Sequence, residues 1–160
     1  MALTFKERFK HNLFLWFFGL TKVRMIFFCR PKIVDITKKK VVLYIPLNRQ
    51  TRNHIKSMYI GTMTVGVDLV TGLTAMLSIR RSKRKIILIF KDLNATFLKR
   101  AEGDTYFTCH SVEEIESAVH EVIRSKDRVN INVPVIATVP DKFGEESVAE
   151  FTITLSMKEY

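Results

Sequence analysis

The segment between Lys56 and Arg80 constrains the fold of this chain more than any other part of the sequence. It contains one charged residue, Asp68, among methionines, valines, leucines, threonines and three glycines. A segment this long and apolar forms either a buried helix or a membrane span, and a carboxylate inside either is costly unless it has partners or a task. A membrane span is the weakest interpretation, because Asp68 and several threonines would have to enter the lipid.

The length of 160 residues predicts a single domain that buries a substantial core. The formal net charge of +10 at pH 7 indicates an anionic partner, unless it serves only solubility. That partner could be nucleic acid, an anionic lipid surface or a phosphorylated small molecule. Nucleic acid is a poor candidate, because the sequence has no basic face interleaved with aromatic residues and no known recognition motif.

The residues that commonly act in redox or metal chemistry form no pattern here. Cys29 and Cys109 are too few for a disulfide framework and are expected to be buried thiols in a reducing compartment. No cysteine and histidine spacing resembles a zinc site, so no metal is expected. The histidines fall in different elements and are expected to be non-catalytic; they are His11, His54, His110 and His120.

Apolar residues at a three-to-four spacing predict a helix over residues 4–28, which Pro31 would end. Its apolar face is unusually wide, which leaves two interpretations. The helix packs on its own domain or on a partner subunit, or it lies as a basic amphipathic helix on a membrane surface. Only eleven uncharged residues separate Lys10 from Lys22, too few to span a bilayer, which needs about 20. No small-residue cleavage site follows, so a signal peptide is not expected and the mature protein is expected in the cytoplasm.

The remaining patterns predict an antiparallel sheet around one long helix. Residues 48–57 are expected to form a loop, followed by a buried helix to about Ile79 and a run of cations at residues 80–85, where they suit the negative end of the helix dipole. Ser111 and Glu114 match a capping box that would start a helix over residues 112–125. The predicted strands cover residues 32–37, 41–47, 86–98, 104–110, 129–139 and 149–158. This order is an α+β layout in which the sheet wraps around the long helix.

The order of elements, and the residues before and inside the long helix, resemble the hotdog fold and in particular its branch of phenylacetyl-CoA-type acyl-CoA thioesterases. The motif of that branch has an asparagine, a histidine six residues later, two glycines directly after it, and an acid nine residues after the histidine. Asn53, Gly61 and Asp68 match this motif at the same intervals. Tyr59 stands at the position of the histidine, and Ile60 at that of the first glycine.

The resemblance covers about residues 32–158. Residues 1–30 look like an N-terminal helical extension to a hotdog domain at residues 31–160, as in an uncharacterised hotdog-like family of unknown function. The resemblance implies an acyl-CoA thioesterase-like protein that hydrolyses or binds an acyl thioester between the subunits of a dimer or tetramer. Coenzyme A is expected only as part of the substrate, with no other cofactor.

The resemblance also implies roles for individual residues. Asp68 would be the general base or the nucleophile, and Asn53 would orient the water or the acid. A backbone N–H of Ile60 or Gly61 would stabilise the oxyanion, and Tyr59 would offer a hydroxyl. The cations expected to meet the phosphates of coenzyme A, or an acidic carrier protein, are Arg49, Arg52, Lys56, Arg81, Lys83 and Arg84.

Each candidate also has a purely structural interpretation. Asp68 could be a satisfied buried carboxylate, Asn53 a turn residue of the loop, and Tyr59 an ordinary core or interface aromatic. The alternative function is a non-catalytic protein that binds lipids or acyl groups, or that associates with a membrane surface through residues 4–28.

Overall fold

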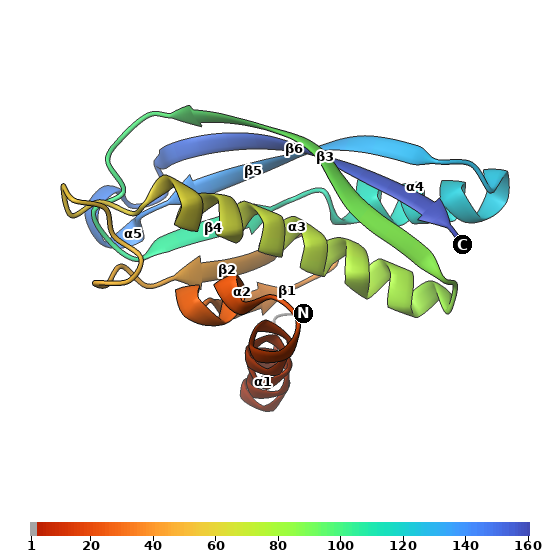
Figure 1. Cartoon of the computed structure of the whole chain (residues 1–160), viewed down its shortest axis with the longest axis horizontal. Coiled ribbons are helices and arrows are strands. Elements are labelled where there is room, and N and C mark those ends of the chain that lie inside the picture. The colour runs from red at the N-terminus through yellow and green to blue at the C-terminus, as the bar shows by residue number, and fades with distance from the viewer. Residues whose placement is uncertain (1–2) are drawn as a thin grey trace.

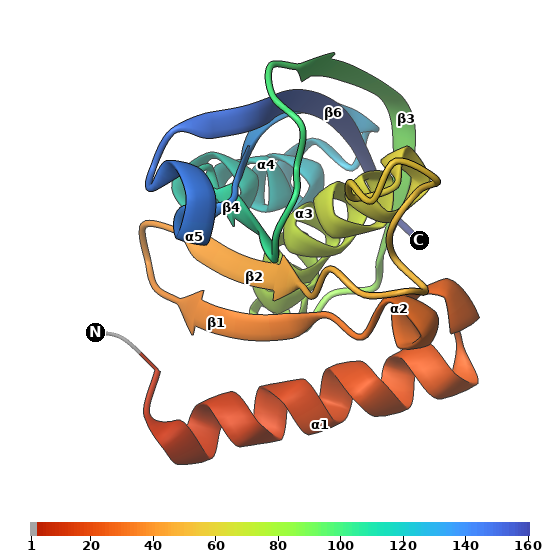
Figure 2. The same ribbon diagram turned by 90° about the vertical axis from the view of Figure 1, so that its left-hand side faces the viewer.

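The structure, a computed structural model, describes residues 3–160. A six-stranded antiparallel sheet in the order β1-β2-β4-β5-β6-β3 curves around the long helix α3 (Figures 1 and 2). The strands are β1 (Lys32–Ile36), β2 (Val41–Ile45), β3 (Ile86–Phe97), β4 (Thr105–Cys109), β5 (Val129–Thr138) and β6 (Ser147–Glu159). The helices are α1 (Phe5–Thr21), α2 (Arg24–Cys29), α3 (Ile60–Ser82), α4 (Val112–Ser125) and α5 (Pro140–Phe143). This is the hotdog arrangement predicted from the sequence.

The central helix α3 is enclosed by the sheet because its composition leaves it no polar face. Val67 and Val70 are completely buried, and so is Thr71, whose hydroxyl donates to the Val67 carbonyl at 2.9 Å. The Thr71 hydroxyl, bonded back to its own helix, brings no unpaired donor into the core. Of the described helices, α3 alone has the length and composition to cross a membrane. Within α3, 56% of the apolar 18-residue stretch that meets this test is buried inside the fold. Its place at the centre of the sheet therefore accounts for its apolar sequence.

Gly66 allows α3 to approach strand β4 closely. A β-carbon at this position would lie 2.4 Å from the ring of Phe107, which is itself completely buried. The aromatic ring occupies the space that a side chain would need, so the backbone of the helix packs directly on the sheet.

The N-terminal segment differs from the single helix predicted over residues 4–28. It forms two helices, and the chain turns between them at Lys22 and Val23, so that α2 folds back on α1 (Figure 2). The turn depends on Gly19, because a β-carbon there would lie 2.7 Å from the backbone nitrogen of Phe27. Gly19 therefore allows α2 to pack closely on α1, and neither a proline nor a glycine stands at the turn itself.

The capping boxes also differ from the prediction. The box forms at Thr4, whose hydroxyl accepts from the backbone N–H of Glu7 while the Glu7 carboxylate accepts from the backbone N–H of Thr4. At the predicted box, Ser111 makes no capping hydrogen bond with its side chain. Its φ of −87° and ψ of 41° are far from the extended conformation that aims an N-cap hydroxyl at the first turn.

The two edge strands of the sheet, β1 and β3, differ in whether another part of the chain covers them. Asn12 of α1 covers the edge strand β1: its Oδ1 accepts from the N–H of Ile33 at 2.8 Å, and its Nδ2 donates to the carbonyl of Ile33 at 3.2 Å. The opposite edge strand, β3, pairs only with β6 and exposes the apolar side chains of Ile87 and Ile89. Within residues 3–160, one edge is therefore protected and the other is open.

We expect Gly66→Ala to destabilise the fold by about 1–3 kcal/mol, because the added methyl group must displace the buried ring of Phe107. Gly72→Ala on the same helix is the matched control. Its β-carbon would meet the ring of Phe90 at an ordinary 3.4 Å, so the gain in helix propensity should leave stability unchanged or raised. Urea unfolding of both variants gives the comparison, and equal stabilities would contradict the packing argument.

Candidate functional site

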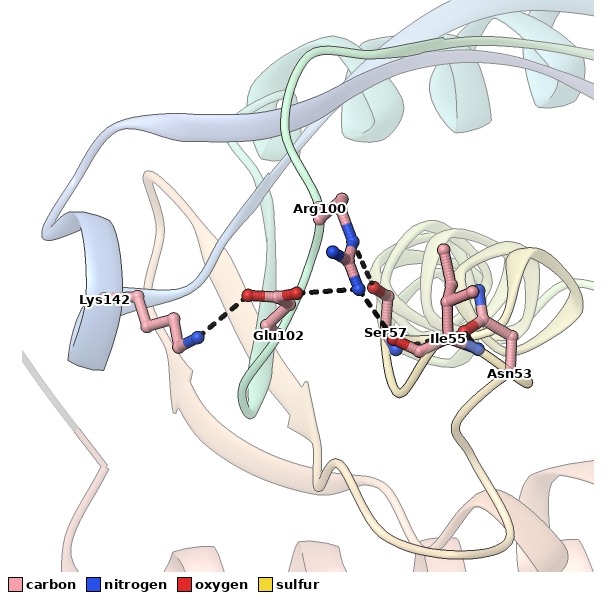
Figure 3. A network of polar contacts seen from close by, with 6 residues as sticks. All are labelled: Asn53, Ile55, Ser57, Arg100, Glu102 and Lys142. Atoms are coloured by element: carbon pink, nitrogen blue, oxygen red, sulfur yellow. Dashed lines mark hydrogen bonds and ion pairs between the residues drawn. The ribbon is translucent and has the colours of Figure 1, made fainter.

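The loop that leads into α3 is fixed by a network of polar contacts (Figure 3). The guanidinium of Arg100 donates from Nη2 to the carbonyl of Ile55 at 2.6 Å and from Nε to the hydroxyl of Ser57 at 3.1 Å. Glu102 pairs with Arg100 at 2.8 Å and with Lys142 at 2.9 Å. These contacts hold the N-terminus of α3 in a defined position relative to the sheet.

Asn53 is the residue that shapes this loop. Its Oδ1 accepts from the backbone N–H groups of Ile55 and Ser57, both at 3.0 Å, and its own N–H donates to the carbonyl of Ser57 at 2.8 Å. An asparagine oxygen shared between two backbone donors is a local turn device. In a single chain Asn53 therefore contacts its own loop and makes no hydrogen bond to Asp68.

Tyr59 and Ile60 stand at the exposed start of α3. Tyr59 is the N-cap, in an extended conformation, and its side chain makes no capping hydrogen bond. The Tyr59 ring lies over Gly61, since a β-carbon at Gly61 would be 2.5 Å from the ring. Both Tyr59 and Ile60 are more than half exposed, at 52% and 54%. The first N–H groups of a helix have no partner within the helix and carry the positive end of its dipole, so this end can stabilise an oxyanion.

Asp68 lies in an apolar cavity of about 370 Å³ between α3, the N-terminal helices and β3. The lining comprises Phe14, Leu15, Phe18, Val23, Ile26, Asp68, Leu69, Gly72, Leu73, Met76, Ile79, Leu88 and Phe90. Among the described residues, nothing donates a hydrogen bond to the carboxylate or pairs with it. Burial alone therefore raises the pKa of Asp68 above its ordinary value.

The helix separates Asp68 from its own N-terminus. Asp68 follows Ile60 by eight residues, which is about 12 Å along the axis at 1.5 Å per residue. A carbonyl bound by the N–H of Ile60 or Gly61 is thus out of reach of the carboxylate in the same chain. The structure brings Tyr59, Ile60 and Gly61 together and leaves Asp68 in a different place.

The six candidate cations form two groups at opposite ends of α3. Arg49, Arg52 and Lys56 are exposed in the loop before the helix. The others follow or end the helix, which is about 35 Å long for its 23 residues. Of these, Arg84 pairs with Glu159 at 2.5 Å and Arg81 with Glu116 at 3.5 Å, so both already have carboxylate partners. One bound coenzyme A cannot contact both groups within a single chain.

Sequence reasoning missed the contribution of the N-terminal helices to this cavity. Phe14 and Phe18 of α1 line it at a spacing of four residues, which places them on one side of the helix. The unusually wide apolar face of residues 4–28 was the available signal.

Other chemistries find little support among the described residues. No group of three or more histidine, cysteine, aspartate or glutamate side chains could hold a metal ion there. Cys29 and Cys109 are buried and unpaired, as predicted, and burial raises the pKa of both thiols, which disfavours the reactive thiolate.

Similar solved structures have the same fold at low sequence identity. A protein of unknown function from Pseudomonas aeruginosa, described as a probable thioesterase, superposes with a TM-score of 0.74 at 20% identity, over 94% of this chain and 96% of that one. A protein of unknown function from Chlorobaculum tepidum gives 0.79 at 12% identity, over 96% and 97%. Zebrafish thioesterase superfamily member 2 gives 0.63 at 17% identity, over 95% and 96%. No curated protein matches the chain by sequence.

These similarities define the class: the chain has the hotdog fold found in structures of the thioesterase superfamily. The sequence also places it in a family, because residues 12–157 match the family described as Domain of unknown function (DUF4442). The chain belongs to this family. The matched region includes most of α1 and all of α2 together with the sheet and α3.

The raised pKa of Asp68 has a consequence for stability. Between the ordinary aspartate pKa of about 3.9 and the raised value, the folded protein binds more protons than the unfolded chain, so the free energy of unfolding falls as pH rises. We expect Asp68→Asn to be more stable than the wild type at pH 7, and the difference to vanish below about pH 3.9, where the carboxyl is neutral in both states.

Urea unfolding at pH 7 and at low pH measures this difference. Asp127→Asn, at an exposed position after α4, is the control for the change of side-chain type and should match the wild type. An Asp68→Asn variant that is less stable than the wild type at pH 7 would mean that the carboxylate has a stabilising partner.

Proposed function

We propose that the protein is an acyl-CoA thioesterase-like hydrolase that acts on an acyl thioester carried by coenzyme A or by a carrier protein. The observation that carries this proposal is Asp68, an unpaired carboxylate in an apolar cavity. A carboxylate with a raised pKa is a better proton acceptor, and such groups gather at catalytic sites. The intervals from Asn53 to Tyr59 and to Asp68, which resemble those of the phenylacetyl-CoA-type branch, support the same assignment.

In the proposed reaction Asp68 acts as general base. Its carboxylate takes a proton from a water molecule as the water oxygen attacks the thioester carbonyl carbon. The carbonyl oxygen becomes an oxyanion that accepts hydrogen bonds from the N–H groups of Ile60 and Gly61. When the intermediate collapses, the carbon–sulfur bond breaks, the thiolate leaves with the proton held by Asp68, and the products are a carboxylic acid and a free thiol.

This reaction requires two copies of the chain. Asp68 and the N-terminus of α3 are about 12 Å apart along one helix. A thioester carbonyl bound at the helix N-terminus of one copy must therefore be attacked by a water that the carboxylate of the other copy activates. The open edge of β3, with Ile87 and Ile89 exposed, offers the surface for antiparallel pairing of two copies. We therefore place the site between subunits of a homodimer, alone or within a tetramer.

The surroundings of Asp68 fit an acyl group. The cavity volume of about 370 Å³ lies within the range of small-ligand sites, and its lining is apolar apart from Asp68. The cations Arg49, Arg52 and Lys56 are exposed in the loop that leads into α3, and we assign them to the phosphates of coenzyme A.

We expect the wild type to hydrolyse at least one member of a panel of acyl-CoA substrates of different chain lengths. Asp68→Asn removes the proton acceptor and should lower kcat by about 100-fold or more. Thiol release, followed with a chromogenic disulfide reagent, measures the rate. Asp127→Asn should keep the wild-type rate. A folded wild type that hydrolyses no member of the panel would exclude the enzymatic function.

A second variant tests the departures from the motif. Replacing Ile60 with glycine opens the approach to the backbone, and replacing Tyr59 with histidine supplies a group that can transfer protons near neutral pH. If the site works as proposed, the double variant should be faster than the wild type. A double variant that folds and is no faster would argue against binding of the carbonyl at this helix end.

We expect the chain to be a dimer or tetramer in solution, and Ile87→Lys with Ile89→Lys to shift it to the monomer, because the added charges oppose pairing along β3. Light scattering after size-exclusion chromatography gives the mass. Ile136→Lys, at an exposed apolar position on β5, is the control and should leave the mass unchanged. Loss of hydrolysis in the monomeric variant would support the shared site, and a monomeric, active wild type would refute it.

A second function is favoured by one specific observation. Tyr59 replaces the histidine of the motif and cannot exchange a proton near neutral pH as histidine does. The protein would then bind an acyl thioester or a lipid in the same cavity without hydrolysing it. Saturable binding of an acyl-CoA by calorimetry, in the absence of any thiol release, would identify this function.

A further inference from the structure

The outer face of α1 exposes several large apolar side chains, and nothing in the described chain covers them. Phe5, Phe9 and Phe17 are 78%, 60% and 59% exposed, and Leu13 and Trp16 are more than half exposed. Only Leu15 and Gly19 of this helix are buried, on the side that faces the rest of the fold. Figure 2 shows α1 as the outermost layer of the molecule, beyond β1 and α2. Exposed apolar side chains gathered on one face of a protein mark a surface that contacts a partner.

The charge around this face is strongly positive. Residues 3–32 contain seven lysines and arginines and one acidic residue, Glu7, whose carboxylate is bonded to Thr4. This segment therefore has a net charge of +6, more than half of the total of +10. Lys6 and Lys10 fall on the outer face itself by helical periodicity, among the aromatic residues.

A groove on one flank of α1 combines the same two properties. It has a volume of about 700 Å³ and lies between α1, α2 and the start of β1. Its walls include the rings of Phe9 and Trp16, which belong to the outer face, and three cations, Arg8, Arg30 and Lys32. No carboxylate lines it. Apolar walls with cations at the rim match an anionic amphiphile, with its chain on the rings and its charged group at the cations.

We propose that α1 docks on an anionic lipid bilayer, lying in the plane of the interface with its outer face in contact with the acyl chains. The rings of Phe9, Trp16 and Phe17 enter the boundary between head groups and acyl chains, where tryptophan is favoured. The cations of residues 3–32 meet the phosphates of anionic head groups, and Arg8, Arg30 and Lys32 hold one such head group at the groove. The helix is about 25 Å long for its 17 residues, which suits an interfacial and not a spanning orientation.

A second copy of the chain is a poorer occupant of this face. Two copies related by a twofold axis would bring two segments of charge +6 together, with Lys6 and Lys10 close to the contact. Glu7 is the only acidic residue in either segment and is already held by Thr4. An anionic bilayer removes this repulsion and covers the same apolar side chains.

Flotation of the full-length protein with lipid vesicles tests this proposal. The wild type should bind vesicles that contain a quarter phosphatidylglycerol, lose most of this binding in high salt, and bind pure phosphatidylcholine much less. Leu13→Glu with Phe17→Glu should weaken binding by about tenfold or more, because it puts two carboxylates into the contact face. Lys6→Glu with Lys10→Glu should abolish the preference for anionic vesicles.

Leu98→Glu with Ile136→Glu is the charge-matched control, since it changes two exposed apolar residues of the sheet region, and it should bind as the wild type does. Circular dichroism of each variant excludes misfolding as the cause. The proposal is overturned if the wild type binds neither vesicle, or if the control loses as much binding as the Leu13 and Phe17 variant. The proposal is also overturned if the wild type does not bind vesicles and the Leu13 and Phe17 variant has a different oligomeric mass from the wild type in light scattering. The outer face of α1 would then join copies of the chain. Hydrolysis tests the proposed function and flotation tests the docking of α1 on a bilayer, so the failure of one proposal does not affect the other.

Discussion

The close contact between α3 and the sheet supports the rest of this structure. Gly66 places the helix backbone against the ring of Phe107, so that α3 packs directly on β4 of the curved sheet. Asp68 owes its properties to a different set of neighbours, the N-terminal helices and β3, which line the cavity around it. A carboxylate on a solvated helix would keep an ordinary pKa, whereas here burial by neighbouring elements raises it without any charged partner. The packing around Asp68 thus makes its ionised form less favourable in the folded protein than in the unfolded chain.

Much of the fold could be predicted because its determinants are local in the sequence. The alternation of Val133, Val135 and Ala137 with exposed residues follows the pleat of a strand, and the long apolar segment around Asp68 could only be a central helix or a membrane span. The features that were missed depend on contacts between distant segments. The contact of Gly19 with Phe27 lets α2 fold back on α1, and the backbone angles of Ser111 prevent its capping box. Neither feature can be recognised from a sequence pattern.

The candidate site also has features that could be predicted from the sequence and features that could not. The intervals from Asn53 to Asp68 can be read directly from the sequence, but the roles cannot, because they depend on where each side chain points. Asn53 could be expected either to orient a catalytic group or to shape a turn, and in a single chain its Oδ1 is bonded within the loop. The cavity beside Asp68 could not be predicted at all, since Phe14 and Phe18 reach it from a helix more than forty residues away in the sequence.

The amide of Asn12 also limits how copies of this chain can assemble. By bonding to both backbone groups of Ile33, it prevents another strand from pairing with β1 at that residue. A sheet with two open edges can add molecules at both ends and grow into a fibre. With β3 as the one open edge among residues 3–160, pairing through the sheet ends after a single addition. Among residues 3–160, the amide of Asn12 thus leaves β3 as the sheet edge that is open to strand pairing.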